Sequence, residues 1–143
     1  MTISLFLISL SGALCWGVAP IFGKLGLANI HPLDGLAART VVTLTFLAMW
    51  IVLSKGFMRI IAIPPQEWLY LGIEAFLATL AGDLAYYAAL KWGEAGVSAV
   101  VFAVSPVFTI WLSNIVFKEA FSVIQMWGVG MVAIGVLLVF SGY

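Results

Sequence analysis

Residues 82–108 read GDLAYYAALKWGEAGVSAVVFAVSPVF, and this stretch decides the fold. An acid, Asp83, lies inside an apolar helical pattern, and a short polar turn from Lys91 to Glu94 follows it. A second apolar pattern then continues until Pro106 interrupts it. Ionisable residues in such apolar helices usually face a cavity or a charged partner. The stretch therefore predicts a helical hairpin in lipid that carries a polar site.

The composition extends this interpretation to the whole chain. Of 143 residues, 64% are hydrophobic and 8% are charged, whereas a soluble domain has roughly 25% charged residues. The mean hydropathy is +1.20. We therefore expect an all-α, multi-pass integral protein of the cell (inner or plasma) membrane. The formal net charge is zero, which argues against nucleic-acid binding, because that requires clustered lysine and arginine.

Five apolar runs are long enough to cross a bilayer, which takes roughly 20 residues. Prolines end the helical patterns at Pro32 and at Pro64–Pro65, and tryptophans near several of the expected span ends match an aromatic belt. The short loops leave no room for a soluble domain. Residues 1–143 are therefore predicted to form a single membrane domain with spans at about 3–25, 33–54, 67–90, 96–117 and 122–140.

The basic residues that flank these spans are divided evenly between the two sides of the membrane. An odd number of spans puts the termini on opposite sides, and we call the N-terminal side A and the other side B. Three basic residues belong to each side: Lys55, Arg59 and Lys118 to side A, and Lys24, Arg39 and Lys91 to side B. Orientation follows an excess of lysine and arginine on one side. The even division predicts insertion in both orientations, and the alternative is that a weak bias still keeps the N-terminus inside.

Three ionisable residues fall inside the predicted spans: Arg39, Glu74 and Asp83. Each costs at least about 2.5 kcal/mol to insert, so each is expected to face a cavity or a partner. At ~1.5 Å per residue, Arg39 lies about 9 Å and Asp83 about 10 Å below side B, so the two can meet within one subunit. Glu74 lies about 10 Å below side A, the level that Arg39 of an antiparallel copy would reach. The three residues are candidates for an ion pair or for proton coupling, and the alternative for Asp83 is a pair with Arg39 that holds the fold.

The direction of the two acids favours Asp83 as the site residue. On an ideal α-helix, a separation of nine residues at ~100° each turns Glu74 and Asp83 to nearly opposite faces. The face of Asp83 also carries Thr79, Tyr86 and Tyr87, which suit the wall of a cavity. The face of Glu74 carries alanines, which suit close helix packing, so for Glu74 a partner-facing or interfacial position is the alternative.

Other residues complete a predicted substrate cavity. Pro106 frees a backbone carbonyl in mid-membrane, and Ser105 beside it can help to satisfy the exposed groups; broken helices at this depth often bind transported substrates. Trp16, in the middle of the first span, is a candidate aromatic wall. The alternatives are a static kink at Pro106 and plain packing of Trp16. The predicted cavity is lined by Trp16, Arg39, Asp83, Tyr87, Ser105 and Pro106.

No group of residues indicates a catalytic or metal centre. His31 lies in a turn beside a proline without His or Cys companions, and Cys15 falls inside an apolar run. The sequence has no phosphate-binding glycine loop with a lysine, and no nucleophile has a base at a readable spacing. We therefore expect no enzymatic activity, no cofactor and no metal.

Several short motifs follow one another along nearly the whole chain. They are Cys15-Trp16-Gly17, Ile21-Phe22-Gly23-Lys24, Arg39, Tyr86-Tyr87-Ala88-Ala89-Leu90, Ala95-Gly96-Val97-Ser98-Ala99, Ser105-Pro106-Val107-Phe108, Glu119 with Ser122 and Gln125, Gly128, and Gly135-Val136. In this order and spacing they resemble one repeat of the EamA family, in the drug/metabolite transporter superfamily. The usual member is similar to two such repeats in tandem, about ten helices related by inverted topology, and exports amino acids, nucleotide sugars, drugs or other metabolites. This chain resembles a single repeat, so the resemblance implies that its helices form one half of a ten-helix fold.

The resemblance and the charge balance together imply a function. Two oppositely inserted copies can rebuild an inverted repeat. We therefore expect an antiparallel homodimer, or a heterodimer with a homologous half, that exports small metabolites such as amino acids by alternating access. Its partners would be the small-molecule substrate and membrane lipid. The alternatives are a non-transporting membrane subunit that binds a partner protein or lipid, and a component of a lipid-linked-sugar flippase.

Orientation mapping tests the charge balance. A reporter fused after Tyr143 is expected to be active on both sides of the membrane in one culture, because neither side of the chain carries the excess of basic residues that fixes orientation. Activity on one side alone would show a single orientation and remove dual insertion.

Overall fold

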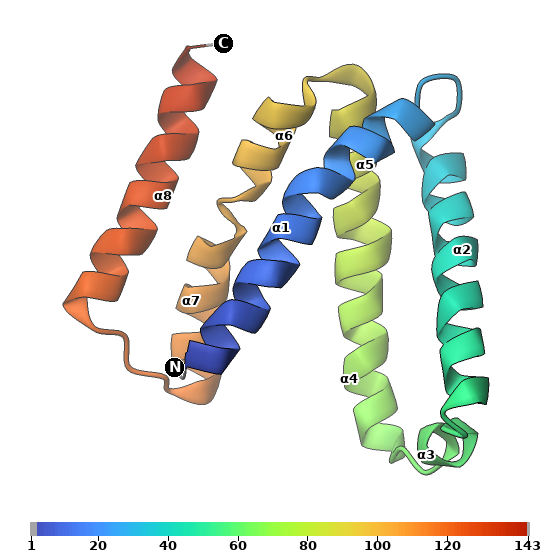
Figure 1. Ribbon diagram of the computed structural model, residues 1–143. Coiled ribbons are helices and arrows are strands. Elements are labelled where there is room, and N and C mark those ends of the chain that lie inside the picture. Colours follow the sequence, from blue (N-terminus) through green and yellow to red (C-terminus); the bar gives the residue numbers. More distant parts are fainter. Residues whose placement is uncertain (1–2, 143) are drawn as a thin grey trace. The chain divides into compact units, whose positions relative to one another are not determined.

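The computed structural model describes residues 3–142, and the regular elements in this range are all helical (Figure 1). In chain order they are α1 (Ile3–Gly26), α2 (Pro32–Leu53), α3 (Phe57–Ile61), α4 (Pro65–Ala75), the π-helix η1 (Phe76–Gly82), α5 (Asp83–Trp92), α6 (Ala95–Phe102), α7 (Ser105–Phe117) and α8 (Val123–Ser141). The prediction of an all-α protein is confirmed for these residues. The short helix α3, in a loop on side A, was not expected.

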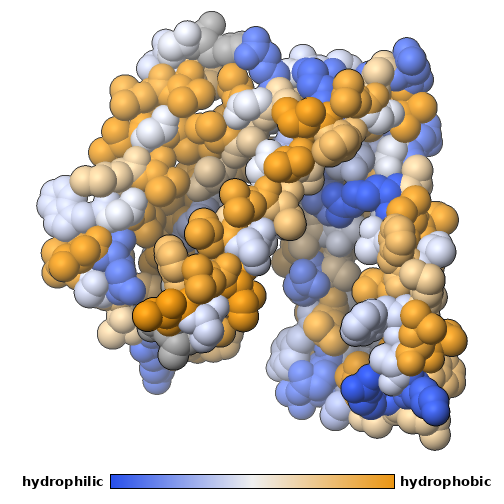
Figure 2. All heavy atoms as spheres, in the orientation of Figure 1, coloured by the Kyte–Doolittle hydropathy of each residue, from blue (hydrophilic) through white to orange (hydrophobic). Residues whose placement is uncertain are grey.

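Five helical segments in the described residues are long and apolar enough to cross a membrane. They are Ile3–Gly26, Pro32–Leu53, Pro65–Trp92, Ala95–Phe117 and Val123–Ser141. Their large apolar side chains are mostly exposed, as Ile124 is at 82%, and Figure 2 shows apolar residues along much of the visible helix surface. Such exposure is unfavourable in water and normal in lipid. The prediction of five membrane-spanning helices is thereby confirmed.

The chain divides into two compact units. We call Ile21–Trp92 the central unit, and the chain before and after it the flanking unit. Helix α1 begins in the flanking unit and ends in the central unit. The prediction of a single domain over residues 1–143 stays a prediction.

The core of the central unit lies where the turn after α1, the start of α2 and the second half of α5 meet. Leu27 and Leu90 are 1% exposed, Leu36 is 4% exposed and Tyr87 is 8% exposed. Gly35 permits this close packing, because a Cβ at its position would lie 2.5 Å from Cδ2 of Leu27 and 3.5 Å from Cδ2 of Tyr87. The position of α2 beside α5 therefore depends on a residue without a side chain.

Helix α2 begins where its sequence supplies a cap. The N–H of Leu33 donates to Nδ1 of His31 at 3.3 Å, so His31 is the N-cap residue. Pro32 follows in the first turn, where its missing N–H costs nothing. Asp34 adds a negative charge close to the positive end of the helix dipole. These residues fix the start of α2 directly after the turn.

Lys91, in the last turn of α5, holds the turn that follows α1. Its Nζ donates to the backbone oxygens of Leu27 and Ala28, both at 2.7 Å. Carbonyl groups at the C-terminus of a helix lack intrahelical partners and attract a cation. The two hydrogen bonds therefore tie the end of α5 to the turn that precedes α2.

The third span is not a uniform α-helix. Between α4 and α5 the backbone forms wide π turns over Phe76–Gly82. Gly82 suits them, because a Cβ at its position would lie 3.1 Å from the carbonyl oxygen of Leu77. A π turn closes over more residues than an α turn, so each residue rotates the chain by less. The prediction that Glu74 and Asp83 face nearly opposite directions assumed α-helical rotation, and this assumption is wrong across η1.

In the flanking unit, the fourth span breaks beside its proline, as the sequence predicts. Helix α6 ends at Phe102 and α7 begins at Ser105, with Pro106 in its first turn, because a proline ring lacks the N–H donor and clashes with the carbonyl four residues earlier. Helix α8 packs against α6 and α7. It starts with a capping box: the N–H of Gln125 donates to Oγ of Ser122, and the N–H of Ser122 donates to Oε1 of Gln125.

Replacing Gly35 with alanine is expected to lower the free energy of unfolding by about 1–3 kcal/mol, because the new Cβ overlaps Leu27, which is fully enclosed. Gly72→Ala on α4 is the matched control. No heavy atom lies within 4 Å of the Cβ position there, so alanine should leave stability unchanged or raise it by up to about 1 kcal/mol. Thermal unfolding of both purified variants in detergent provides the comparison. Equal midpoints would contradict the packing of α2 against this turn.

Candidate functional site: an ion pair inside the membrane

The candidate site lies between two packed helices of the central unit. Helix α2 packs against α5 and carries Arg39, two turns after the helix begins. Asp83 is the first residue of α5, directly after the π turns, and Tyr87 follows one turn later. With α-helical rise, Arg39 lies about 10 Å along α2 from Pro32. The site is therefore inside a membrane-spanning segment and not at its edge.

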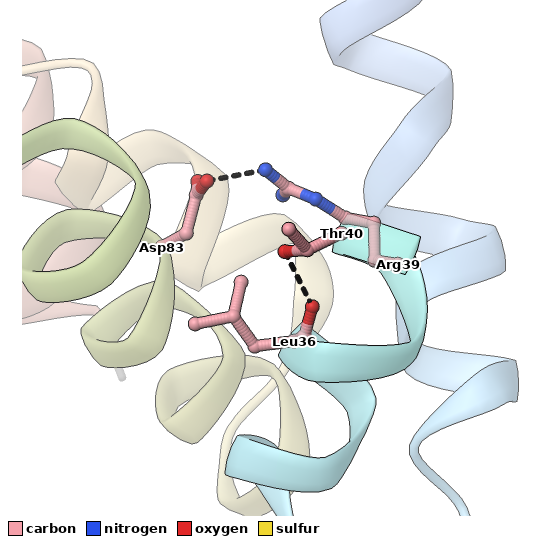
Figure 3. Close-up of polar contacts among 4 residues, drawn as sticks. All are labelled: Leu36, Arg39, Thr40 and Asp83. Atoms are coloured by element: carbon pink, nitrogen blue, oxygen red, sulfur yellow. Dashed lines mark hydrogen bonds and ion pairs between the residues drawn. The ribbon is translucent and has the colours of Figure 1, made fainter. Parts of the chain in front are cut away.

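The structure joins Arg39 to Asp83 by an ion pair. Nη2 of Arg39 donates a hydrogen bond to Oδ2 of Asp83, and the two side chains point toward one another across the helix interface (Figure 3). The Asp83 side chain is 14% exposed and that of Arg39 is 41% exposed. A single embedded charge is costly in lipid, and an opposite charge in contact offsets most of that cost. The pair thus places an acidic and a basic side chain in contact inside the span.

Tyr87 supports the guanidinium from one side. Cζ of Arg39 lies 5.5 Å from the centroid of the Tyr87 ring, within the range in which the negative face of an aromatic ring attracts a cation. Tyr87 itself is 8% exposed, so the core holds the ring in place. The guanidinium therefore has two neighbours on α5, an acid and an aromatic face.

Two other polar side chains of the central unit donate hydrogen bonds to backbone oxygens. The hydroxyl of Thr40, next to Arg39 on α2, donates to the backbone oxygen of Leu36 at 2.8 Å (Figure 3). Lys91 is engaged with the turn after α1. Arg39 therefore differs from Lys91: it lies well inside a span, and its side chain is still partly exposed.

Glu74 stands apart from this pair. It lies on α4, inside the third span, and it is exposed. Within residues 3–142, no ion pair or hydrogen bond joins its carboxylate to another side chain. In lipid an ionisable residue of this kind faces a cavity or a partner.

The remaining residues of the predicted cavity belong to the flanking unit. Trp16 lies in the middle of α1 and is 74% exposed. Ser105 and Pro106 begin α7 and are exposed. The structure thus brings Arg39, Asp83 and Tyr87 together, and the lining of a cavity by Trp16, Ser105 and Pro106 stays a prediction.

Sequence reasoning missed two features of the site. The π turns before Asp83 have no distinguishing sequence pattern beyond the small residue Gly82. Lys91 was assigned to a turn, but it lies in α5 and binds backbone carbonyls of a distant segment. A lysine in the last turn of one helix, beside a turn that ends another, is the signal that could have indicated this contact.

A metal centre would need several ligands close together. No group of three or more His, Cys, Asp or Glu residues in the described range is arranged to hold a metal ion.

The chain has five apolar helices, and an ion pair joins the second span to the third. These features define an α-helical, multi-pass integral membrane protein. Within this class, the chain belongs to the EamA-like transporter family, whose family model matches residues 2–141. Its family membership identifies it as a membrane transporter protein.

Three relatives are similar to this chain over most of its length. An uncharacterized transporter in the cobO 3′ region of a Sinorhizobium species is 32% identical over 118 residues, 82% of this chain and 83% of the relative. An uncharacterized protein of Methanocaldococcus jannaschii is 26% identical over 88% of both chains. An uncharacterized transporter of Archaeoglobus fulgidus is 26% identical over 94% of this chain, which spans only 48% of that relative. No solved structure matches the chain significantly.

A double-mutant cycle tests the ion pair. Arg39→Gln and Asp83→Asn are each expected to lower the free energy of unfolding by about 1–3 kcal/mol, because each leaves one charge unpaired inside a span. The double variant removes both charges, so its loss should be smaller than the sum of the single losses by at least about 0.5 kcal/mol. Chemical unfolding in detergent micelles gives the values for all the variants. Strictly additive losses would show that the two charges do not interact.

Proposed function

We propose that this chain is one half of a secondary transporter of the cell membrane, which works as an antiparallel homodimer and exports small metabolites by alternating access. Membership of a transporter family supports transport as the activity. The proposed activity involves no covalent catalysis and no cofactor. The observation that carries the dimer is the exposed acid Glu74 on α4, which has no charged partner among residues 3–142.

Glu74 needs an opposite charge that the described residues of its own chain do not supply. By depth, Glu74 lies about 14 Å along the third span from Pro65 on side A, and Arg39 lies about 10 Å along α2 from Pro32 on side B. In a copy inserted the other way round, Arg39 approaches the level of Glu74. The Arg39 side chain is 41% exposed, so it retains surface with which to meet a second acid.

The topology supports the same arrangement. With five spans, the two ends of the chain lie on opposite sides of the membrane. The flanking basic residues are divided evenly between these sides, so neither orientation is favoured. The Archaeoglobus relative, of which this chain spans 48%, has room for a second such unit in one polypeptide. Two inverted units around a central site are the architecture in which many transporters alternate access.

The residues of the ion pair indicate the kind of substrate. Arg39, Asp83 and Tyr87 offer a cation, an anion and an aromatic ring close together. We propose that amino acids, which carry both charges, are among the transported metabolites. Trp16 and the helix break before Pro106 would complete the lining of the cavity in the dimer.

Tandem fusions test this proposal. Because each copy has an odd number of spans, a short polar linker between two copies forces the second copy to insert inverted, whereas a linker that contains one additional spanning helix forces a parallel pair. Liposomes that hold the first fusion are expected to exchange a radiolabelled amino-acid mixture against the same unlabelled mixture. Liposomes that hold the second fusion, the matched control, should not differ from empty ones.

Two results would count against the proposal. Exchange by the parallel fusion alone would exclude the antiparallel arrangement. Absence of exchange by both fusions, with both correctly folded, would favour a non-transporting subunit that binds a partner protein or lipid.

A further inference from the structure

We infer that Arg39 is the docking point for a carboxylate group of the transported molecule, and that Asp83 occupies this point when no substrate is bound. The inference rests on the proposed transport function and makes it more specific. It assigns an order of binding: the substrate carboxylate displaces the carboxylate of Asp83 from the guanidinium. The substrates are accordingly small organic acids, including amino acids with a free carboxyl group, and not organic cations.

The first argument is the unequal exposure of the two charges. The Asp83 side chain is 14% exposed and the Arg39 side chain is 41% exposed. A ligand that approaches the pair therefore meets the guanidinium far more readily than the carboxylate. An arriving anion finds an accessible cation, while an arriving cation finds an acid that is largely covered and already neutralised.

The second argument is the geometry of the hydrogen bond. The contact between the two residues runs through a single pair of atoms, Nη2 of Arg39 and Oδ2 of Asp83. A guanidinium has five N–H donors in a planar fork, and the strongest carboxylate complexes use two parallel hydrogen bonds. The one-atom contact leaves other N–H donors of the guanidinium unused, so a mobile carboxylate that forms two parallel hydrogen bonds can compete with Asp83.

The third argument is that Arg39 does not move when its acid is displaced. The Tyr87 ring lies 5.5 Å from Cζ of Arg39, and this ring is held in the core at 8% exposure. The attraction between the ring and the cation persists whichever carboxylate is bound. The guanidinium therefore stays oriented for the ligand, which lowers the entropy cost of binding.

Anionic lipid headgroups carry the same kind of oxygen atoms as a soluble carboxylate. Headgroups lie at the helix ends, whereas Arg39 is about 10 Å along α2 from Pro32. Depth thus favours a soluble ligand, and the experiment separates the two sources.

The probe is benzoate, a small carboxylate with an apolar ring, added to the full chain in nanodiscs of zwitterionic lipid. Arg39 and Arg59 are the two arginines of the sequence, so ¹⁵Nε-arginine labelling gives one Nε–H signal from each, and Arg59→Lys assigns them. Benzoate is expected to shift the Arg39 signal in a saturable way and to leave the Arg59 signal in place. Benzamide, its neutral analogue, and benzylamine, a cation, should leave both signals unchanged.

Variants then measure the competition, with radiolabelled benzoate as the readout. Asp83→Asn removes the competing charge and is expected to lower the Kd for benzoate at least about fivefold. Asp83→Glu keeps a competing carboxylate, so its Kd should stay close to that of the parent even if the asparagine variant folds poorly. Arg39→Lys retains the charge but lacks the planar fork, and is expected to abolish saturable binding.

The results that would overturn the inference are distinct from those that would overturn transport. An Arg39 signal that does not respond to benzoate, or an unchanged Kd in a folded Asp83→Asn variant, removes the docking point, while exchange by the inverted tandem fusion can still hold. A shift caused by phosphatidylglycerol and not by benzoate assigns Arg39 to lipid and also overturns the inference. Benzoate binding without exchange by either fusion would instead overturn the transport proposal.

Discussion

A charge inside hydrocarbon must be matched by an opposite charge, and the contact between Arg39 and Asp83 is how the central unit meets this constraint. The surrounding structure serves to keep two helices close enough for that contact. Gly35 lets α2 approach the turn after α1. Lys91 ties the end of α5 to the same turn, and Tyr87 holds the guanidinium from the core side. The small buried core is thus placed beside the pair, while most other apolar side chains are left for lipid.

How far the sequence determines this arrangement differs between levels of structure. Length and apolarity alone predict the five spans, because a fixed hydrocarbon thickness sets the length of a spanning helix. Counting the rise per residue also puts Arg39 and Asp83 at similar depths, and the structure pairs them. The directions in which side chains point are harder to predict from the sequence. They depend on helical rotation, and the π turns at Phe76–Gly82 change that rotation without a recognisable sequence pattern. The contact of Lys91 with distant carbonyls depends on tertiary packing, which periodicity does not encode.

The same electrostatic constraint applies to Glu74, which also lies inside a span. Within residues 3–142 this acid has no charged partner, although it lies in a helix that is long and apolar enough to span the membrane. A soluble protein would leave such a carboxylate in water at little cost. A membrane protein has to place it against a cavity or a second subunit. The even distribution of flanking basic residues removes the usual obstacle to an inverted second copy, so the two observations, although independent, support one arrangement.

In the proposed dimer, one guanidinium has three acceptors: Asp83 of its own chain, Glu74 of the inverted copy and the carboxylate of a ligand. If one acceptor replaces another, the guanidinium is never left unpaired in lipid during a transport cycle, and an unpaired charge there is costly. Competition of this kind couples binding to conformation, because each acceptor favours the arrangement of helices in which it is closest. The π turns next to Asp83 are relevant here, since irregular helical hydrogen bonding often accompanies functional sites. A salt bridge optimised for stability alone would use both oxygens of a buried acid. The one-atom contact to a half-exposed arginine is better suited to an exchange of partners.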